Sequence, residues 1–311
     1  SIGRRPPLSA LFAEPTIAHM ADVIIKDKPA EDAAILTLGP LDGPPFFFLH
    51  GDVQGGGFYC RGLAKALPGR SIMAVAPEDV TAGNQTPSIE EMAQRHLEAI
   101  RALRPRGPYA LGGWCVGGII AYEIARRLEA QGEGVTQLVL IDAVPHTGWL
   151  FWLRRLIERL GALIKAPHHE NVWRFSWWRV QGERLEQVWR HRKGLSKLWA
   201  SARRALAKTQ SSSKGLAAFF EDAAALKRGP RRDAMGALRW SAAGYVPKPY
   251  RGPVSLLMAQ QLLDEGIDPT RVWRRVAAGT VLVPVPGDHL SCITTHVSDL
   301  AKAIAAPQGA K

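Results

Sequence analysis

Residues 113–117 place a cysteine where a catalytic nucleophile would stand. The run reads Gly113-Trp114-Cys115-Val116-Gly117, and it lies between a short apolar strand-like segment and an apolar helix-like segment. This context is typical of a nucleophile elbow, a turn from strand to helix so sharp that only small residues fit at its flanks. The start of a helix also favours a thiolate at Cys115. We therefore expect acyl chemistry at Cys115, with a buried structural cysteine as the alternative.

A thiol nucleophile needs a base, and the base needs an orienting acid. His289 follows the last predicted strand in the loop Pro286-Gly287-Asp288-His289, which is where a fold with this elbow places its base. His50 competes with it, because its loop would face the elbow. Two carboxylates are candidates for the acid: Asp142 ends the strand after the elbow helix, and Asp264 follows the next strand.

The oxyanion hole that this chemistry requires is expected from two backbone amides. One is the amide of Val116, directly after the nucleophile. The other comes from the loop at Asp52-Val53, which the run Gly55-Gly56-Gly57 would allow to approach a substrate closely.

Several further side chains are candidates for lining the substrate path. They are Trp114, His50, Trp177 and Trp178. The alternative for the tryptophans is the core of a small helical module. Cys292, three residues after His289, is expected to be a buried structural thiol, with a place near the site as the alternative.

The composition excludes several classes of protein. A chain of 311 residues with 46% hydrophobic content can bury one large core or two modest ones. Because no apolar run approaches the roughly 20 residues of a membrane span and no signal peptide opens the chain, we expect a soluble, cytoplasmic protein without membrane contact. Three scattered cysteines predict neither a disulfide framework nor a metal site.

The net charge of +12 is concentrated in one segment. Residues 149–233 contain 19 Lys and Arg against 7 Asp and Glu, which is the whole excess, together with seven of the ten tryptophans. No nucleic-acid-binding motif accompanies this charge, so nucleic acid is not expected as a partner. The segment is predicted to be a separate module.

Strand and helix signals alternate along most of the chain, which predicts an α/β fold with a largely parallel sheet. Apolar residues at helical spacing over 149–164 interrupt this alternation just after Asp142, and more helix is expected around 188–206. A capping box at Ser88 predicts the start of another helix. The predicted strands cover 35–38, 46–49, 71–75, 108–112, 138–141, 254–258 and 280–283, and further helices cover 88–103 and 297–305.

Four motifs together resemble those of a known family. They are Phe48-Leu49-His50-Gly51, the elbow run 113–118, Leu140-Ile141-Asp142-Ala143 and Gly287-Asp288-His289. In this order they are similar to the motifs of type I thioesterase domains that end nonribosomal peptide and polyketide synthetases, over about residues 45–305. The resemblance implies an α/β-hydrolase fold with a mostly parallel sheet and an inserted helical lid, about 146–240. It favours Asp142 over Asp264 as the acid, and the sequence departs from the family in having Cys115 where serine is usual.

The N-terminal residues resemble part of a carrier domain. The run 11–21 is similar to the last helix of such a domain, so residues 1–25 are interpreted as its C-terminal remnant, 26–44 as a linker with the first strand, and 306–311 as a tail. The resemblance implies an upstream peptidyl carrier domain of the same synthetase as partner. That domain would supply the phosphopantetheine arm, and this chain itself is expected to bind no cofactor.

Cysteine in place of serine has a chemical implication. An acyl chain moved from a carrier thioester to Cys115 remains a thioester and keeps its activation, which helps most when the release step is difficult. Family members with cysteine here are associated with four-membered rings, both β-lactones and β-lactams, and we favour β-lactam closure as in monobactam synthetases of the sulfazecin type. The basic lid is compatible with an anionic peptidyl substrate, an acidic carrier domain, the pantetheine phosphate or a merely solvated cationic face.

Three alternatives remain at this point. A purely hydrolytic thioesterase would use the same residues. A stand-alone cysteine hydrolase of the dienelactone type would pair Asp264 with His289. A non-catalytic module that docks a carrier domain would have a buried, unreactive Cys115.

Overall fold

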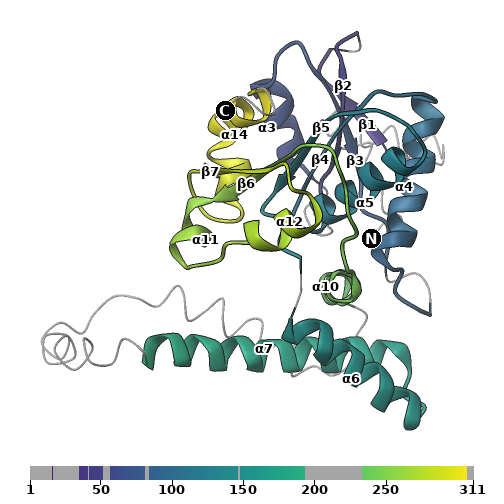
Figure 1. The fold of residues 1–311 in the computed structure, drawn as a ribbon, viewed down its shortest axis with the longest axis vertical. Coiled ribbons are helices and arrows are strands. Elements are labelled where there is room, and N and C mark those ends of the chain that lie inside the picture. Colours follow the sequence, from purple (N-terminus) through teal and green to yellow (C-terminus); the bar gives the residue numbers. More distant parts are fainter. Residues whose placement is uncertain are drawn as a thin grey trace, which may run out of the picture. The chain divides into compact units, whose positions relative to one another are not determined.

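The computed structural model describes residues 16, 35–40, 42–51, 57–80, 84–145, 148–192 and 233–306 (Figure 1). Except for Thr16, the carrier-like segment 1–25 lies outside these residues, as do Asp52, Val53 and the 307–311 part of the tail. The chain divides into two compact units. The first contains residues up to Asp79, Pro87–Thr147 and the chain from Tyr245 onward, and the second contains Val80–Thr86 and Gly148–Gly244.

The first unit is built on a seven-stranded sheet with the strand order β1-β3-β2-β4-β5-β6-β7. Only the edge strand β1 runs antiparallel to its neighbour, and every other pair is parallel. The predicted α/β class and mostly parallel sheet are confirmed. The strands are β1 (Ile35–Leu38), β2 (Pro45–Leu49), β3 (Ser71–Val75), β4 (Tyr109–Trp114), β5 (Val135–Ile141), β6 (Val254–Ala259) and β7 (Thr280–Val285).

Helices cover both faces of this sheet (Figure 1). Helices α4 and α5 pack together on one face, and α3 and α14 pack together on the other. The capping box predicted at Ser88 begins α4: the Ser88 hydroxyl accepts the Glu91 N–H, and the Glu91 carboxylate accepts the Ser88 N–H. The helices of this unit are α3 (Tyr59–Ala66), α4 (Ile89–Leu103), α5 (Val116–Ala130), α11 (Gln260–Asp264), α12 (Thr270–Val276), α13 (Ser291–Thr294) and α14 (Val297–Ala305).

The central strand β2 shows why its sequence is apolar without alternation. Phe46 and Phe48 belong to the core shared with α3 and α14, whereas the ring of Phe47 lies 6.3 Å from that of Tyr109. All three phenylalanines are completely buried. A strand covered on both faces requires such a continuous apolar run.

The second unit consists of helices α6 (Trp149–Leu163), α7 (His168–Arg192) and α10 (Ala234–Gly244), together with residues 80–86. Its core contains Ile157, Val172, Phe175, Trp240 and Ala243. The helix predicted over 149–164 is confirmed by α6. Of the helix expected around 188–206, residues 188–192 form the end of α7 and the remainder lies outside the described residues.

Helix α6 buries a narrower face than its apolar pattern suggests. Leu150, Leu153 and Ile157 pack in the core of the second unit, whereas Trp152 and Leu163 are exposed. Among the helices described, none combines the length and the apolar character needed to cross a membrane.

Candidate active site

Cys115 lies in the sharp turn between β4 and α5. Its backbone adopts φ 56° and ψ −125°, a conformation that costs energy for a residue other than glycine and is typical of functional sites. The Cys115 N–H donates to the Ile141 carbonyl of β5 at 2.9 Å, and the Gly118 N–H donates to the Cys115 carbonyl at 3.1 Å. The strained turn is therefore held from both sides by regular structure.

The two glycines of the elbow are required by close backbone contacts. A Cβ atom on Gly117 would collide with the Leu49 carbonyl oxygen, and one on Gly113 would collide with the Gly117 carbonyl. The prediction that only small residues fit at these flanks is confirmed. Val116 is the first residue of α5, so its amide is at the helix N-terminus beside Cys115.

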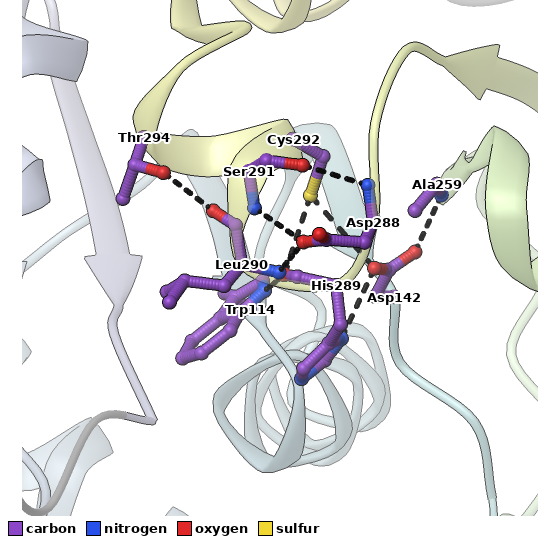
Figure 2. A network of polar contacts seen from close by, with 9 residues as sticks. All are labelled: Trp114, Asp142, Ala259, Asp288, His289, Leu290, Ser291, Cys292 and Thr294. Carbon is purple, nitrogen blue, oxygen red and sulfur yellow. Dashed lines mark hydrogen bonds and ion pairs between the residues drawn. The ribbon is translucent and has the colours of Figure 1, made fainter. Parts of the chain in front are cut away.

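Asp142 follows β5 directly and is held by the neighbouring strand β6. Its N–H donates to the Leu257 carbonyl at 2.8 Å, and its Oδ1 accepts the Ala259 N–H at 2.7 Å. The side chain is buried, and Oδ2 is 3.0 Å from His289 Nδ1 (Figure 2). Both carboxylate oxygens are thus engaged, and the acid has one orientation.

His289 lies on the loop between β7 and α13, and a polar turn shapes this loop (Figure 2). The Asp288 carboxylate accepts the N–H groups of Leu290 and Ser291 at 2.9 and 2.7 Å, while the Ser291 hydroxyl accepts the Asp288 N–H at 2.7 Å. These backbone hydrogen bonds hold the pKa of Asp288 below its usual value. The loop therefore presents His289 with its side chain 41% exposed, whereas the Asp142 side chain beside it is fully buried.

The charge state of His289 depends on its neighbours. Burial lowers the pKa of His289, but hydrogen bonds with Asp142 and Cys115 and the negative charge of both groups outweigh it and raise the pKa to about 10. Because Nδ1 faces Asp142, Nε2 is the nitrogen left to exchange a proton with a reacting group. These contacts favour the imidazolium form of His289.

Of the two candidate acids, the structure brings only Asp142 to His289. Asp264 lies in α11, where its Oδ1 accepts a hydrogen bond from Gln260 at 2.8 Å. The three groups at Cys115, Asp142 and His289 follow the ends of β4, β5 and β7 (Figure 1). They therefore gather at the carboxyl edge of the sheet, where open α/β sheets bind their ligands.

Trp114, which the sequence predicts to line a substrate path, contacts the base directly. It is buried, its ring is stacked on the His289 imidazole with centroids 4.6 Å apart and planes at 25°, and its Nε1 donates to the His289 carbonyl at 3.0 Å (Figure 2). No pattern in the sequence indicated this contact with the base.

The remaining residues predicted for the site belong to other elements of the chain. His50 is buried after β2, where its carbonyl accepts a hydrogen bond from the Tyr59 hydroxyl at 3.2 Å. Trp177 and Trp178 belong to α7 of the second unit, where they pack edge to face and are 36% and 53% exposed. Asp52 and Val53, expected to supply an oxyanion amide, lie outside the described residues.

Cys292 is a buried thiol that contacts both the acid and the base. Its Sγ is 3.8 Å from Asp142 Oδ2 and 3.5 Å from the His289 carbonyl (Figure 2). Burial and the charge of Asp142 raise the pKa of this thiol, so it stays protonated at neutral pH. Within the described ranges, no three His, Cys, Asp or Glu side chains converge in a way that could hold a metal ion.

A mostly parallel sheet with an elbow after one strand, an acid after the next and a histidine after the last defines an α/β-hydrolase fold. The family model for the thioesterase domain matches residues 45–306, and the chain therefore belongs to the thioesterase family. Its relatives are the type I thioesterase domains of polyketide and nonribosomal peptide synthetases.

Two much longer synthetases illustrate this relationship. A non-reducing polyketide synthase of Pseudevernia furfuracea is 40% identical over 112 residues, which is 36% of this chain and 5% of that protein. Malpibaldin synthetase of Mortierella alpina is 34% identical over 142 residues, or 44% of this chain and 2% of that protein. The chain thus matches only a small part of each of these proteins.

Two solved structures support the same fold. The NocB thioesterase domain in covalent complex with a fluorophosphonate nocardicin G analogue is 25% identical with a TM-score of 0.54, covering 88% of this chain and 99% of that chain. A four-domain nonribosomal peptide synthetase, holo-AB3403 bound to AMP and glycine, has a TM-score of 0.54 at 23% identity, covering 93% of this chain and 21% of that one.

Proposed function

We propose that this thioesterase domain releases an acyl chain from a carrier-bound phosphopantetheine thioester through an acyl-enzyme at Cys115. The observation that carries the proposal is the hydrogen bond between His289 Nδ1 and the buried Asp142, 3.0 Å long, together with the interaction of Cys115 with the same imidazole. Nucleophile, base and acid then act in that order, as in other catalytic triads.

In the acylation step, the Cys115 thiolate attacks the thioester carbonyl carbon and a new C–S bond forms. The negative charge on the carbonyl oxygen is stabilised by the Val116 amide and by an amide of the loop at Asp52-Val53. When the tetrahedral intermediate collapses, the bond to the pantetheine sulfur breaks, and the departing thiolate takes the proton held by His289. The products are an acyl-Cys115 thioester and the free carrier thiol.

In the release step, His289 accepts a proton from the incoming nucleophile while that nucleophile attacks the acyl-Cys115 carbonyl. The Cys115 thiolate leaves, and the thiolate and imidazolium pair is restored. If the nucleophile is a nitrogen of the acyl chain itself, the product is a lactam; if it is water, the product is the free acid.

We favour closure of a β-lactam ring, as in monobactam synthetases of the sulfazecin type. Its support is Cys115 in place of serine, because the acyl chain remains a thioester, and a weak nitrogen nucleophile closing a strained ring needs that activation. A covalent complex of the NocB thioesterase domain with a nocardicin G analogue supports a covalent route in a domain of this fold.

The partner would be an upstream peptidyl carrier domain of the same synthetase, which carries the phosphopantetheine arm. The similarity to part of a four-domain synthetase is in keeping with such an arrangement. The excess positive charge of residues 149–233 would suit an anionic peptidyl substrate or an acidic carrier surface.

Two of the alternatives lose support from the site. A dienelactone-type hydrolase would place Asp264 on His289, but Asp264 bonds Gln260. A docking module would bury Cys115, yet Cys115 is partly exposed whereas Cys60 and Cys292 are buried. A hydrolytic thioesterase uses the same residues and differs only in its product.

The test is intact-mass spectrometry after incubation with peptidyl-pantetheine thioesters, with small-molecule products measured in parallel. We expect an acyl adduct that peptide mapping places on Cys115, and a product lighter than the free acid by one water. Cys115→Ala should give neither adduct nor product. Cys115→Ser should acylate and then stall or hydrolyse.

Cys60 and Cys292 serve as internal controls, because both thiols are buried and should remain unmodified in the native protein. Free acid as the only product of the wild-type protein would establish hydrolysis instead of cyclisation. An unmodified wild-type Cys115 across varied thioesters would disprove the acyl-enzyme and leave the docking module as the better interpretation.

A further inference from the structure

We propose that Trp114, the residue before the nucleophile, is a positioning residue that fixes the His289 imidazole and favours its protonated form. The effect of Trp114 on rate rests on the proposed function of Cys115, whereas its effect on His289 can be measured without that function.

Two separate contacts join Trp114 to His289 (Figure 2). The indole and imidazole rings are stacked, with centroids 4.6 Å apart and an interplanar angle of 25°. The indole Nε1 also donates to the His289 backbone carbonyl at 3.0 Å. One contact restrains the rotation of the imidazole, and the other restrains the loop that carries it.

Trp114 is itself held in place, so it can act as a rigid support. It is the last residue of β4, where it pairs with Ile141 of β5, and it is only 8% exposed. The ring of Tyr59 packs edge to face against the indole, with centroids 5.4 Å apart. The Tyr59 hydroxyl donates to the His50 carbonyl at 3.2 Å, which fixes Tyr59 in turn.

The stacking has an electrostatic consequence. The face of an indole ring carries negative potential and attracts a cation more strongly than a neutral ring. Imidazolium is the state that His289 reaches when it has taken the Cys115 proton, so the stack stabilises the state that contains the thiolate. The proton taken from Cys115 is later given to the departing thiol, and the balance of protons over the cycle is unchanged.

Other titratable groups also face His289 and act on the same equilibrium. Asp142 and Cys115 raise its pKa. The protonated Cys292 thiol contacts the His289 carbonyl, and the exposed Asp288 directly precedes His289 in the chain. The contribution of Trp114 must therefore be measured with these four groups held constant, except where Cys115 is removed on purpose.

The experiment follows the titration of the His289 side chain by NMR in a Cys115→Ala background. In that background, Trp114→Leu removes both contacts and should lower the pKa of His289 by about 0.5. Trp114→Phe keeps an aromatic face but loses the N–H donor, and it should lower the pKa less than Trp114→Leu. Trp240→Phe, a buried tryptophan of the second unit, is the matched control and should leave the titration unchanged.

A second readout uses the chain with Cys115 present. Alkylation of Cys115 by iodoacetamide, followed by mass spectrometry at a series of pH values, should show the step that accompanies loss of the His289 proton at a pH lower by about 0.5 in Trp114→Leu. A folded Trp114→Leu protein with an unchanged His289 titration would overturn the proposal, and so would an equal change in Trp240→Phe.

If Trp114→Leu does not fold, the His289 titration of Trp114→Phe in the Cys115→Ala background is compared with that of Cys115→Ala alone, and this comparison tests the proposal. An unchanged titration in that variant, together with an unchanged position of the His289 resonances, would then reject the positioning role. Failure of the acyl-enzyme proposal has a different signature, because thioesters would then leave Cys115 unmodified in the wild-type protein while the His289 titration still responded to Trp114.

Discussion

At the scale of single residues, the Asp142 side chain is held in one orientation by two hydrogen bonds. Its Oδ1 accepts the Ala259 N–H and its Oδ2 accepts from His289, at 2.7 and 3.0 Å. Its backbone has φ 46°, a left-handed conformation that asparagine and aspartate tolerate better than most residues. The backbone conformation suits asparagine as well as aspartate. Only the two hydrogen bonds of the side chain therefore require a carboxylate at position 142.

Asp142→Asn should fold and lose activity. An amide nitrogen in place of one oxygen would face either the Ala259 N–H or the His289 Nδ1–H, donor against donor, so the imidazole loses its orientation. We expect kcat/KM for release from a pantetheine thioester to fall about 10²-fold or more. Asp264→Asn is the matched control and should stay within about twofold of the wild type. The opposite pattern in the two variants would make Asp264 the acid.

The raised pKa of His289 predicts a pH dependence of folding stability. His289 has a pKa of about 10 in the folded chain against an ordinary value of 6.5, so the folded state holds this proton more tightly. The stabilisation is complete below pH 6.5, declines between pH 6.5 and 10, and is lost above pH 10. Urea unfolding at pH 6, 8 and 10 should show a smaller decline in His289→Gln than in the wild type. An identical decline in both proteins would mean that His289 titrates normally.

At the scale of elements, the elbow depends on how closely β2, β4 and α5 approach one another. Gly117→Ala would place a Cβ atom against the Leu49 carbonyl of β2, and backbone atoms cannot move away as a flexible side chain can. We expect the free energy of unfolding to fall by about 2–3 kcal/mol, measured by urea denaturation.

Gly134→Ala provides the comparison for this change, because its Cβ atom would lie 3.5 Å from Pro108, an ordinary contact distance. That variant should lose less than about 0.5 kcal/mol, as surface substitutions usually do. Equal losses in the two variants would show that the elbow has room to relax.

Periodicity in the sequence was sufficient to predict helices and strands that pack an apolar face against the rest of the protein. Strands 35–38 and 71–75 and the helix over 297–305 have the predicted bounds as β1, β3 and α14. The five-residue α11 and four-residue α13 hold little more than one helical turn and leave no period to detect. Most of α7 was missed because its buried face mixes Val172 and Phe175 with the polar Asn171 and Arg179.

A site residue was predictable where its side-chain type and its position in the chain indicate the same role, as they do for Cys115. The choice between Asp142 and Asp264 followed from family resemblance, because which carboxylate meets His289 depends on strand pairing that no local pattern contains. The Ala259 N–H that holds Asp142 is a backbone group and leaves no trace in the sequence. The spacing of Asp288 and Ser291 was a usable signal for the turn beside His289.

At the scale of the whole molecule, each of the two units has a hydrophobic core of its own among the residues that the structure describes. One lies within the seven-stranded sheet and its helices, and the other is formed by α6, α7 and α10. Trp240 is central to the second: its ring packs edge to face on Phe175 at 5.5 Å, and the Arg154 guanidinium lies 4.8 Å from its centroid. Each core draws its residues from a single unit, so each can lose order separately.

Trp240→Ala should therefore destabilise one unit and spare the other. Removal of this buried indole is expected to cost about 3–5 kcal/mol. In hydrogen exchange followed by mass spectrometry, peptides from α6, α7 and α10 should exchange faster, while peptides from β4 and β5 should keep their protection. Faster exchange throughout the chain would show that the two units unfold as one.

The second unit is inserted in the sequence between two neighbouring strands of the first unit. Strands β5 and β6 are direct neighbours, with Ile141 opposite Leu257, although the helical unit Gly148–Gly244 lies between them in the sequence. The sheet thus holds the strands before and after the insertion side by side, and each doubling of the inserted length adds only about 0.6 kcal/mol of closure entropy. We therefore expect that the helical unit can be lengthened, shortened or replaced, in evolution or by design. The hydrogen bonds between β6 and Asp142 should stay as they are.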